Sequence, residues 1–228
     1  MSEGPIIGTL QERSLHASLK DLYMTEEAQS EVAVDGFVID VVRNNLLIEI
    51  QTSNFAAIKA KLRALLNNHK VRLVYPLAKE KWIVKETPDG VKEISRRKSP
   101  KQCRFEDVFD ELVRIPRLIA HSNFSIEVLL IEEEEVRRQD GKGSWRRKGW
   151  SIIDRKLLEI VDRKLYEQPS DFLHFIPDNL EKPFRTSDLV ESLGISRRLG
   201  QRLTYCLRKM NALREVGKNG NALLLDIA

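Results

Sequence analysis

The sequence predicts an α/β protein with a mixed, partly parallel sheet flanked by helices, followed by a small, mainly helical C-terminal domain. Residues 31–52 (EVAVDGFVIDVVRNNLLIEIQT) alternate like two strands joined by a tight turn. A helix at 54–68 and a short apolar strand at 71–76 follow, and this order requires a right-handed crossover between parallel strands. Near the C-terminus, two helices separated by a glycine turn precede a second hairpin.

Length and composition fit a soluble protein of two domains. The 228 residues are 42% hydrophobic, and no apolar run approaches the ~18 residues of a membrane span. The N-terminal residues lack the basic start and apolar core of a secretory signal. Two cysteines far apart in the sequence and four scattered histidines indicate neither a disulfide framework nor a zinc site. We therefore expect a cytoplasmic protein that does not enter a membrane.

The charges are distributed unevenly along the chain. Residues 1–136 contain 19 Lys and Arg against 22 Asp and Glu, a net charge of −3, whereas residues 137–228 contain 19 against 12, a net charge of +7. These two values account for the +4 of the whole chain. A basic half suggests binding to a polyanion, and a solvated basic surface without a partner is the alternative.

The first helix is expected at residues 8–24. Its apolar stripe consists of Leu15, Leu19 and Leu22. Glu12 lies three residues before Leu15 on the same face, and His16 flanks the stripe. Glu12 either belongs to a site on this face or lies in the first turn of the helix, where an acid suits the helix dipole.

The hairpin that follows contains acids where a sheet would otherwise place apolar residues. In its second strand, Leu47, Glu49 and Gln51 face one way. A buried carboxylate costs several kcal/mol unless something pairs with it, so Glu49 needs a partner, and a metal ion is one such partner.

The length of the hairpin turn decides which aspartate accompanies Glu49. With a three-residue turn at 43–45, Asp35 shares the side of Glu49. With a two-residue turn at Asn44-Asn45, Asp40 lies directly opposite Glu49. We favour Asp35 as the partner of Glu49 for its spacing and its Val-Asp-Gly context, and Asp40 is the alternative.

The middle of the chain continues the first domain. In the helix at 54–68, Lys59 falls inside the apolar sector and Lys61 points elsewhere on a straight helix. A small hairpin, a basic loop, a helix and a long strand are expected at 81–94, 95–101, 105–112 and 124–136. The strand ends in Glu132–Glu135, which we interpret as a solvated edge rather than a metal site.

Residues 137–150 are expected to form a basic linker or loop between a domain at 1–136 and a domain at 151–228, because glycines and charges replace the apolar periodicity. Residues 151–166 then predict an amphipathic helix. In the linker, the basic cluster Arg146, Arg147 and Lys148 stands between Trp145 and Trp150. Such a cluster binds nucleic-acid phosphates while an aromatic ring stacks on a base, or it is a solvated loop with both rings packed inward.

The C-terminal segment predicts a helix that is capped by Thr186 or Ser187 and runs to Leu193, a turn at 194–196, a longer helix from Arg197, and a hairpin at 213–226. This order resembles a winged helix-turn-helix, whose second helix enters the major groove of DNA. The resemblance implies DNA contacts from Arg197, Arg198, Gln201, Arg202 and Lys218. A winged helix that binds protein is the alternative.

The order of a helical Glu, an Asp and a Glu-x-Gln motif resembles the PD-(D/E)xK nuclease superfamily, in particular its resolvase-like and competence-type members. The matching residues are Glu12, Asp35 and Glu49-Ile50-Gln51, and the likeness covers residues 8–76. Fourteen positions separate Asp35 from Glu49, which suits the superfamily's usual interval. The resemblance implies a restriction-endonuclease-like sheet and a Mg²⁺-dependent deoxyribonuclease.

The resemblance also implies a metal site. Mg²⁺ or Mn²⁺ prefers oxygen ligands, so Asp35, Glu49 and the backbone carbonyl of Ile50 would hold the ion, with Glu12 assisting through water. The ion would lower the pKa of a bound water and neutralise charge on the phosphate.

The departure from the superfamily pattern is Gln51, which stands where a lysine is usual. An amide orients water but contributes no positive charge to the transition state. Lys59, on the helix that follows, is our candidate for the missing charge, and Lys61 is the reserve.

The sequence therefore predicts a metal-dependent nuclease that hydrolyses phosphodiester bonds in DNA, with the C-terminal winged helix binding the substrate. One alternative is a non-catalytic DNA-binding regulator with a degenerate nuclease-like domain, and another is an adaptor that binds proteins. RNA as the substrate and a homodimer as the assembly are compatible with the sequence.

Overall fold

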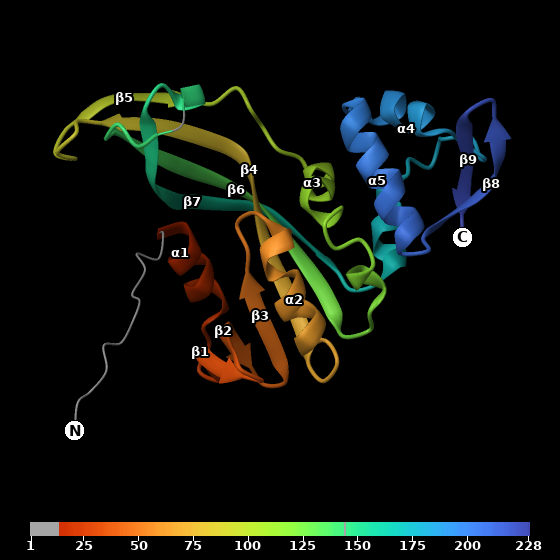
Figure 1. Ribbon diagram of the computed structural model, residues 1–228, viewed down its shortest axis with the longest axis horizontal. Helices are drawn as coiled ribbons and strands as arrows, with labels where there is room; N and C mark the ends of the chain where they lie inside the picture. The colour runs from red at the N-terminus through yellow and green to blue at the C-terminus, as the bar shows by residue number, and fades with distance from the viewer. Residues whose placement is uncertain (1–13, 144) are drawn as a thin grey trace.

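The computed structural model describes residues 14–143 and 145–228, which form a mixed α/β fold (Figure 1). The helices are α1 (Ser14–Tyr23), α2 (Phe55–Leu65), α3 (Phe109–Leu112), α4 (Thr186–Leu193) and α5 (Arg197–Lys209), with 3-10 helices η1 (Phe105–Val108), η2 (Leu118–Ala120), η3 (Trp145–Arg147) and η4 (Pro169–Phe175). The strands are β1 (Ala28–Val34), β2 (Phe37–Arg43), β3 (Leu46–Ile50), β4 (Lys70–Glu86), β5 (Glu93–Lys98), β6 (Phe124–Gln139), β7 (Trp150–Tyr166), β8 (Leu213–Asn219) and β9 (Ala222–Ile227).

The first seven strands form one mixed sheet in the order β1-β2-β3-β4-β6-β7, with β5 paired to β4. Strands β1 to β3 are an antiparallel meander, whereas β3, β4 and β6 run parallel to one another. Helix α2 makes the crossover between β3 and β4, as the strand–helix–strand order predicted. The predicted partly parallel sheet is therefore confirmed.

Helices cover both faces of this sheet. Phe55 and Leu62 of α2 pack with Leu73 of β4 in the larger core. Leu15 and Leu19 of α1 pack on the opposite side in a second core, together with residues such as Ile48, Val74 and Leu129. Two of the three leucines of the predicted stripe are thus buried, whereas Leu22 is 42% exposed.

Residues 151–166 form a strand, so the predicted amphipathic helix is wrong. Strand β7 pairs antiparallel with β6 from Gln139↔Trp150 to Ile126↔Tyr166. Three register shifts interrupt this pairing, and each β-bulge adds a residue to one strand. Bulges interrupt the alternation of inward and outward side chains along β7. The spacing of its apolar residues therefore resembles that of an amphipathic helix.

The predicted boundary between the domains is also wrong, because β7 belongs to the sheet of the first domain. Residues 137–150 connect two paired strands of one sheet, so they do not link two domains. The C-terminal unit, residues 169–228, begins only after β7. It packs on the body through Arg202 of α5, which forms an ion pair with Asp110 of α3, and through Phe175, whose ring centroid lies 5.1 Å from that of Phe109.

The distal parts of β4, β6 and β7, together with β5, extend away from the body as an arm, which we define as residues 79–101 and 132–158 (Figure 1). The predicted small hairpin is part of it, because β4 pairs with β5. The expected solvated edge at Glu132–Glu135 is wrong. Strand β6 lies between β4 and β7, and Glu133 and Glu135 are 0% and 4% exposed.

The C-terminal unit contains the predicted helix, glycine turn, helix and hairpin in that order. Gly194 ends α4 in the left-handed conformation, with φ of 60°. The Ser196 hydroxyl caps α5 by accepting a hydrogen bond from Leu199 N at 3.2 Å. In residues 14–143 and 145–228, no helix is both long and apolar enough to cross a membrane.

Candidate active site

The β2–β3 turn contains two residues, so the favoured three-residue register is wrong. Arg43 pairs with Leu46, and Val41 pairs with Ile48. Asn44 takes a φ of 52°, which suits the tight hairpin turns whose twist matches that of the flanking strands. Continuing this register by one residue places Asp40 opposite Glu49, as the alternative predicted.

Asp40 links the two strands to α1. Its Oδ2 accepts a hydrogen bond from Ile50 N at 2.8 Å and lies 3.4 Å from His16 Nε2. Burial by itself would raise the pKa of Asp40, but the hydrogen bonds from His16 and Ile50 outweigh it and hold that pKa below its usual value. Asp40 is therefore the ionised carboxylate of the site.

Asp35 lies in a different place from the one that we predicted. It occupies the β1–β2 turn with a φ of 48°, next to Gly36 with a φ of 80°. Its Oδ2 lies 2.9 Å from His69 Nε2, and its side chain is 49% exposed. The structure therefore pairs Asp35 with His69 and leaves Asp40 as the partner of Glu49.

Glu49 is buried beside a lysine of α2. Lys61 Nζ lies 2.5 Å from Glu49 Oε1 and also donates a hydrogen bond of 2.5 Å to the Val38 carbonyl. The Glu49 side chain is only 4% exposed. Burial and the nearby charge of Asp40 raise the pKa of Glu49 to about 7, although Lys61 opposes the shift.

The lysine that contacts Glu49 is thus Lys61, the reserve, and not Lys59. Lys59 is half-buried on α2, and within the described part of the chain no ion pair joins it to Glu49. A helical wheel gives only the direction in which the Lys61 side chain leaves the helix, and not how far it reaches. Its four-carbon stem lets the ammonium reach an acid outside its own sector.

The other predicted site residues are only partly described. Gln51 donates from Nε2 to the carbonyls of Ser53 and, at 3.5 Å, Asn54, so its amide supports the loop that enters α2. The backbone N–H of Ile50 is occupied by Asp40. Glu12 lies outside the described residues. Among the residues that are described, no group of three or more His, Cys, Asp or Glu side chains is placed to hold a metal ion.

His16 is a site residue that the sequence pattern does not single out. Its position beside the apolar stripe of α1 indicated only that it lies near the sheet. Its contact with Asp40 depends on the packing of α1 against β2 and β3, which the sequence pattern does not specify.

The predicted DNA-binding residues occupy two separate places. In the C-terminal unit Arg197, Arg198, Gln201 and Lys218 are exposed, whereas Arg202 is held by Asp110. A cavity of about 610 Å³ opens between α4, α5 and β9, and Arg197 and Gln201 line it. The remaining residues lie at the tip of the arm, where Arg147 Nε donates to the Trp150 carbonyl at 3.2 Å, Lys148 is exposed, and the Arg146 side chain is outside the described residues.

The fold and the site together define a mixed α/β protein with a carboxylate–lysine cluster beside its parallel crossover. Residues 13–167 match the family described as a domain of unknown function, DUF8091, and the chain belongs to this family. The match ends next to the last residue of β7, which agrees with the assignment of β7 to the first domain.

A curated relative covers most of the chain. An uncharacterized protein of Treponema pallidum (strain Nichols) is 33% identical over 187 residues, which are 82% of this chain and 74% of the relative. No solved structure matches the chain.

Proposed function

We propose that the protein is a metal-dependent nuclease whose active site contains Asp40, Glu49 and Lys61. The observation that supports this proposal most strongly is the two-residue turn, because it brings two carboxylates onto neighbouring strands. A lysine of the next helix contacts one of them. This set corresponds to the acids and the lysine of the PD-(D/E)xK superfamily that the sequence resembles, with the lysine moved from position 51 to α2.

The donor set fits a hard divalent cation, Mg²⁺ or Mn²⁺. Burial and then the charge of Asp40 raise the pKa of Glu49, so the Asp40 carboxylate is close enough to disfavour the ionisation of Glu49. A cation held by Asp40 and Glu49 would relieve that repulsion. When it is bound, such an ion acidifies a water molecule and neutralises charge on a phosphate.

The protein groups around the acids have separate tasks in this proposal. His16 and the Ile50 N–H fix the carboxylate of Asp40 by hydrogen bonding to its Oδ2. Lys61 supplies the positive charge that Gln51 lacks, and its contact with the Val38 carbonyl positions the ammonium. Burial keeps the Glu49 carboxylate out of water, which strengthens its interactions with cations.

The exposed basic residues of the C-terminal unit support a DNA substrate. Arg197, Arg198 and Gln201 lie at the start of α5, the helix that the winged-helix resemblance assigns to the major groove. Arg202 is not available for this task in the same conformation, because it is paired with Asp110.

One observation favours a second function, a non-catalytic DNA-binding regulator. Lys61 already pairs with Glu49 and is held by the Val38 carbonyl, so the buried acid has a cationic partner without any metal. In that case the first domain is a degenerate nuclease, and the C-terminal unit carries the activity.

Cleavage of nucleic acid tests the proposal. Labelled duplex, single-stranded and branched DNA and RNA are incubated with Mg²⁺ or Mn²⁺ and either the wild type or Glu49→Ala. We expect cleavage of at least one substrate and a loss of about 100-fold or more in the variant, because the variant lacks a ligand that acts on the reacting phosphate.

Asp35→Asn is the matched control, since it removes a nearby acid of the β1–β2 turn that pairs with His69 and not with the site residues. It should cleave like the wild type, whereas Asp40→Asn should resemble Glu49→Ala. If the wild type cuts nothing but binds DNA with a steep salt dependence, the nuclease proposal fails and the regulator replaces it.

A further inference from the structure

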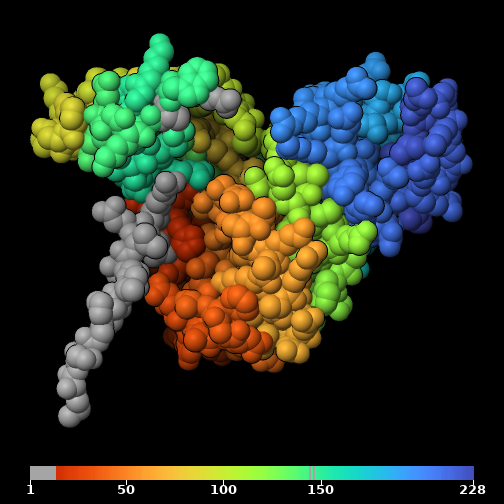
Figure 2. Space-filling view, viewed as in Figure 1, coloured from red at the N-terminus to blue at the C-terminus, as the bar shows by residue number. Residues whose placement is uncertain are grey.

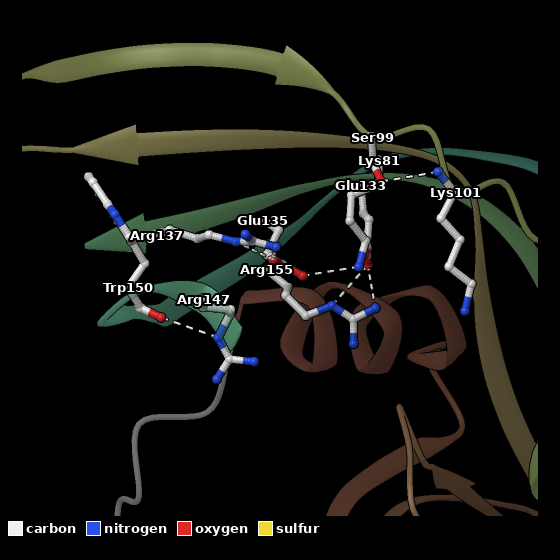
Figure 3. A network of polar contacts seen from close by, with 9 residues as sticks. All are labelled: Lys81, Ser99, Lys101, Glu133, Glu135, Arg137, Arg147, Trp150 and Arg155. Atoms are coloured by element: carbon white, nitrogen blue, oxygen red, sulfur yellow. Dashed lines mark hydrogen bonds and ion pairs between the residues drawn. The ribbon is translucent and has the colours of Figure 1, made fainter. Parts of the chain in front are cut away.

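The arm contains a network of buried acids and half-buried cations that the proposed active site does not use. Lys81 Nζ lies 2.8 Å from Glu133 Oε1 and 3.0 Å from Glu135 Oε2. Arg155 forms an ion pair with Glu133, and Arg137 Nη2 lies 2.5 Å from Glu135 Oε1. Figure 3 shows these five side chains, contributed by three neighbouring strands, gathered at one place on the arm.

The network has a net charge of +1. Three cations face two carboxylates, and the carboxylates are almost fully buried. The side chains of Lys81, Arg137 and Arg155 are 24%, 19% and 16% exposed, and their charged groups are held in position by the buried carboxylates. Cations held in this way lose little conformational entropy when they bind an anion.

The same cations line a cavity where the arm leaves the body. Lys81, Arg137 and Arg155 form one part of the wall of this cavity, whose volume is about 420 Å³. Lys101 also lines it, and within the described part of the chain the Lys101 ammonium makes no ion pair. Figure 3 shows the Lys101 side chain extending beside the network.

The acids in the cavity wall already have partners of their own. Asp107 accepts a hydrogen bond of 2.7 Å from Arg104 N, and Asp110 pairs with Arg202. Glu111 accepts a hydrogen bond of 2.9 Å from Phe55 N at the start of α2. A backbone N–H orients a carboxylate without removing its charge, so only Asp110 is neutralised by a side-chain cation. Lys81, Lys101, Arg137 and Arg155 therefore line the cavity together with two charged carboxylates whose oxygens are already engaged in hydrogen bonds.

The arm as a whole is basic. It contains sixteen Lys and Arg against ten Asp and Glu, a net charge of +6. Every residue of β5 is exposed, including Arg96, Arg97 and Lys98. The Arg96 guanidinium lies 4.1 Å from the ring centroid of Trp82, which presents a cation and an aromatic ring on one surface. Figure 2 shows the arm and the C-terminal unit standing above the body in this view.

We propose that the arm cavity binds a phosphodiester group of a nucleic-acid strand through Lys81, Lys101, Arg137 and Arg155. Thr52, next to Gln51, also lines the cavity, so the bound strand would continue toward Glu49. This path rests on the proposed function, whereas the binding of phosphate by the arm does not. Guanidinium groups suit phosphate oxygens because their N–H donors form a fixed fork.

Binding in the absence of divalent metal tests this proposal separately from cleavage. Fluorescence anisotropy of labelled single-stranded and duplex DNA and RNA is measured in EDTA at several salt concentrations for the full chain. We expect Lys101→Ala to weaken binding about tenfold and to reduce the slope of log K against log salt by about 0.7 to 0.9. Lys101→Arg should bind like the wild type.

Lys70→Ala is the matched control, because it removes one exposed lysine at the other end of β4. It should leave both the affinity and the slope unchanged. Arg155→Met combined with Glu133→Gln is a second variant that removes a guanidinium without leaving its buried acid charged. It should weaken binding at least as much as Lys101→Ala.

The proposal is overturned if Lys101→Ala and the double variant bind nucleic acid as tightly as Lys70→Ala. It is also overturned if inorganic phosphate displaces the oligonucleotide at an equal concentration of phosphate groups, which would indicate a site for a free anion. The measurement in EDTA involves neither divalent metal nor cleavage, so a failure of the nuclease proposal alone leaves this result intact.

Discussion

The body and the arm both bury glutamates, but they compensate the buried charge in opposite ways. In the body, Glu49 faces a single ammonium from Lys61 and lies near a second acid, Asp40. The cation does not offset burial and repulsion, so the pKa of Glu49 rises to about 7.

In the arm, the two buried acids Glu133 and Glu135 contact three cations. Although burial opposes it, the ammonium of Lys81 and the guanidinium of Arg137 hold the pKa of Glu135 below its usual value. In turn, burial would lower the pKa of Lys81, but Glu133 and Glu135 outweigh it and raise that pKa.

The amount of positive charge next to a buried acid determines which function the acid suits. An acid that is short of positive charge can accept a proton or a cation, which is the property of a reactive site. An acid with surplus positive charge around it orders its partners, which makes a rigid surface for an anion.

The largest effect on stability is expected in the arm. Arg155→Ala leaves Glu133, which is 0% exposed, with Lys81 alone, and removing one partner of a buried ion pair costs about 3 to 5 kcal/mol. Urea denaturation of the wild type and the variant measures this loss. Arg155→Met with Glu133→Gln should recover most of it, and a single variant as stable as the wild type would contradict the importance of the network.

The pH dependence of unfolding should differ between the two regions. The folded pKa of Glu49, about 7, lies above its ordinary value of 4.5, so the folded state holds this proton more tightly. The contribution of Glu49 is complete below about pH 4.5 and is lost as the pH rises through about 7, by about 3 kcal/mol. The lowered pKa of Glu135 acts in the opposite direction, because its contribution is lost as the pH falls.

Unfolding free energies at a series of pH values between 4 and 8 check this sign. Glu49→Gln should flatten the decrease between about pH 4.5 and 7, whereas Glu135→Gln should leave that decrease in place. A wild-type stability that rises steadily through this range, and a Glu49→Gln variant with the same slope, would show that Glu49 does not keep its proton.

The smallest effect on stability is expected at Asp35, which pairs with His69 and not with the site residues. Its partner is His69, both side chains are partly exposed, and such pairs contribute little. Asn tolerates the positive φ of this turn, so Asp35→Asn should change the unfolding free energy by at most about 0.5 kcal/mol. A thermal denaturation curve well below that of the wild type would show that the pair has a larger structural role.

Several features of the fold follow from the sequence because their causes are local. The glycine turn at Gly194 separates the two C-terminal helices and is present, whereas the residue in the N-cap position of α4 is Arg185 and not Thr186 or Ser187. The crossover through α2 follows from the order of a strand, a helix and a buried strand. In the hairpin, both possible turn lengths were evident, and the pattern correctly placed Glu49 on a buried face.

What the sequence by itself determined is therefore the set of elements that depend on neighbouring residues, namely the glycine turn of the C-terminal unit and the crossover through α2. Only the tertiary structure decided the state of β7 and of the two glutamates in β6, because their partners lie on strands distant in the sequence. It also chose Asp40 over Asp35 and Lys61 over Lys59. Those choices depend on a one-residue difference in register and on the reach of a long side chain, and neither is encoded in periodicity.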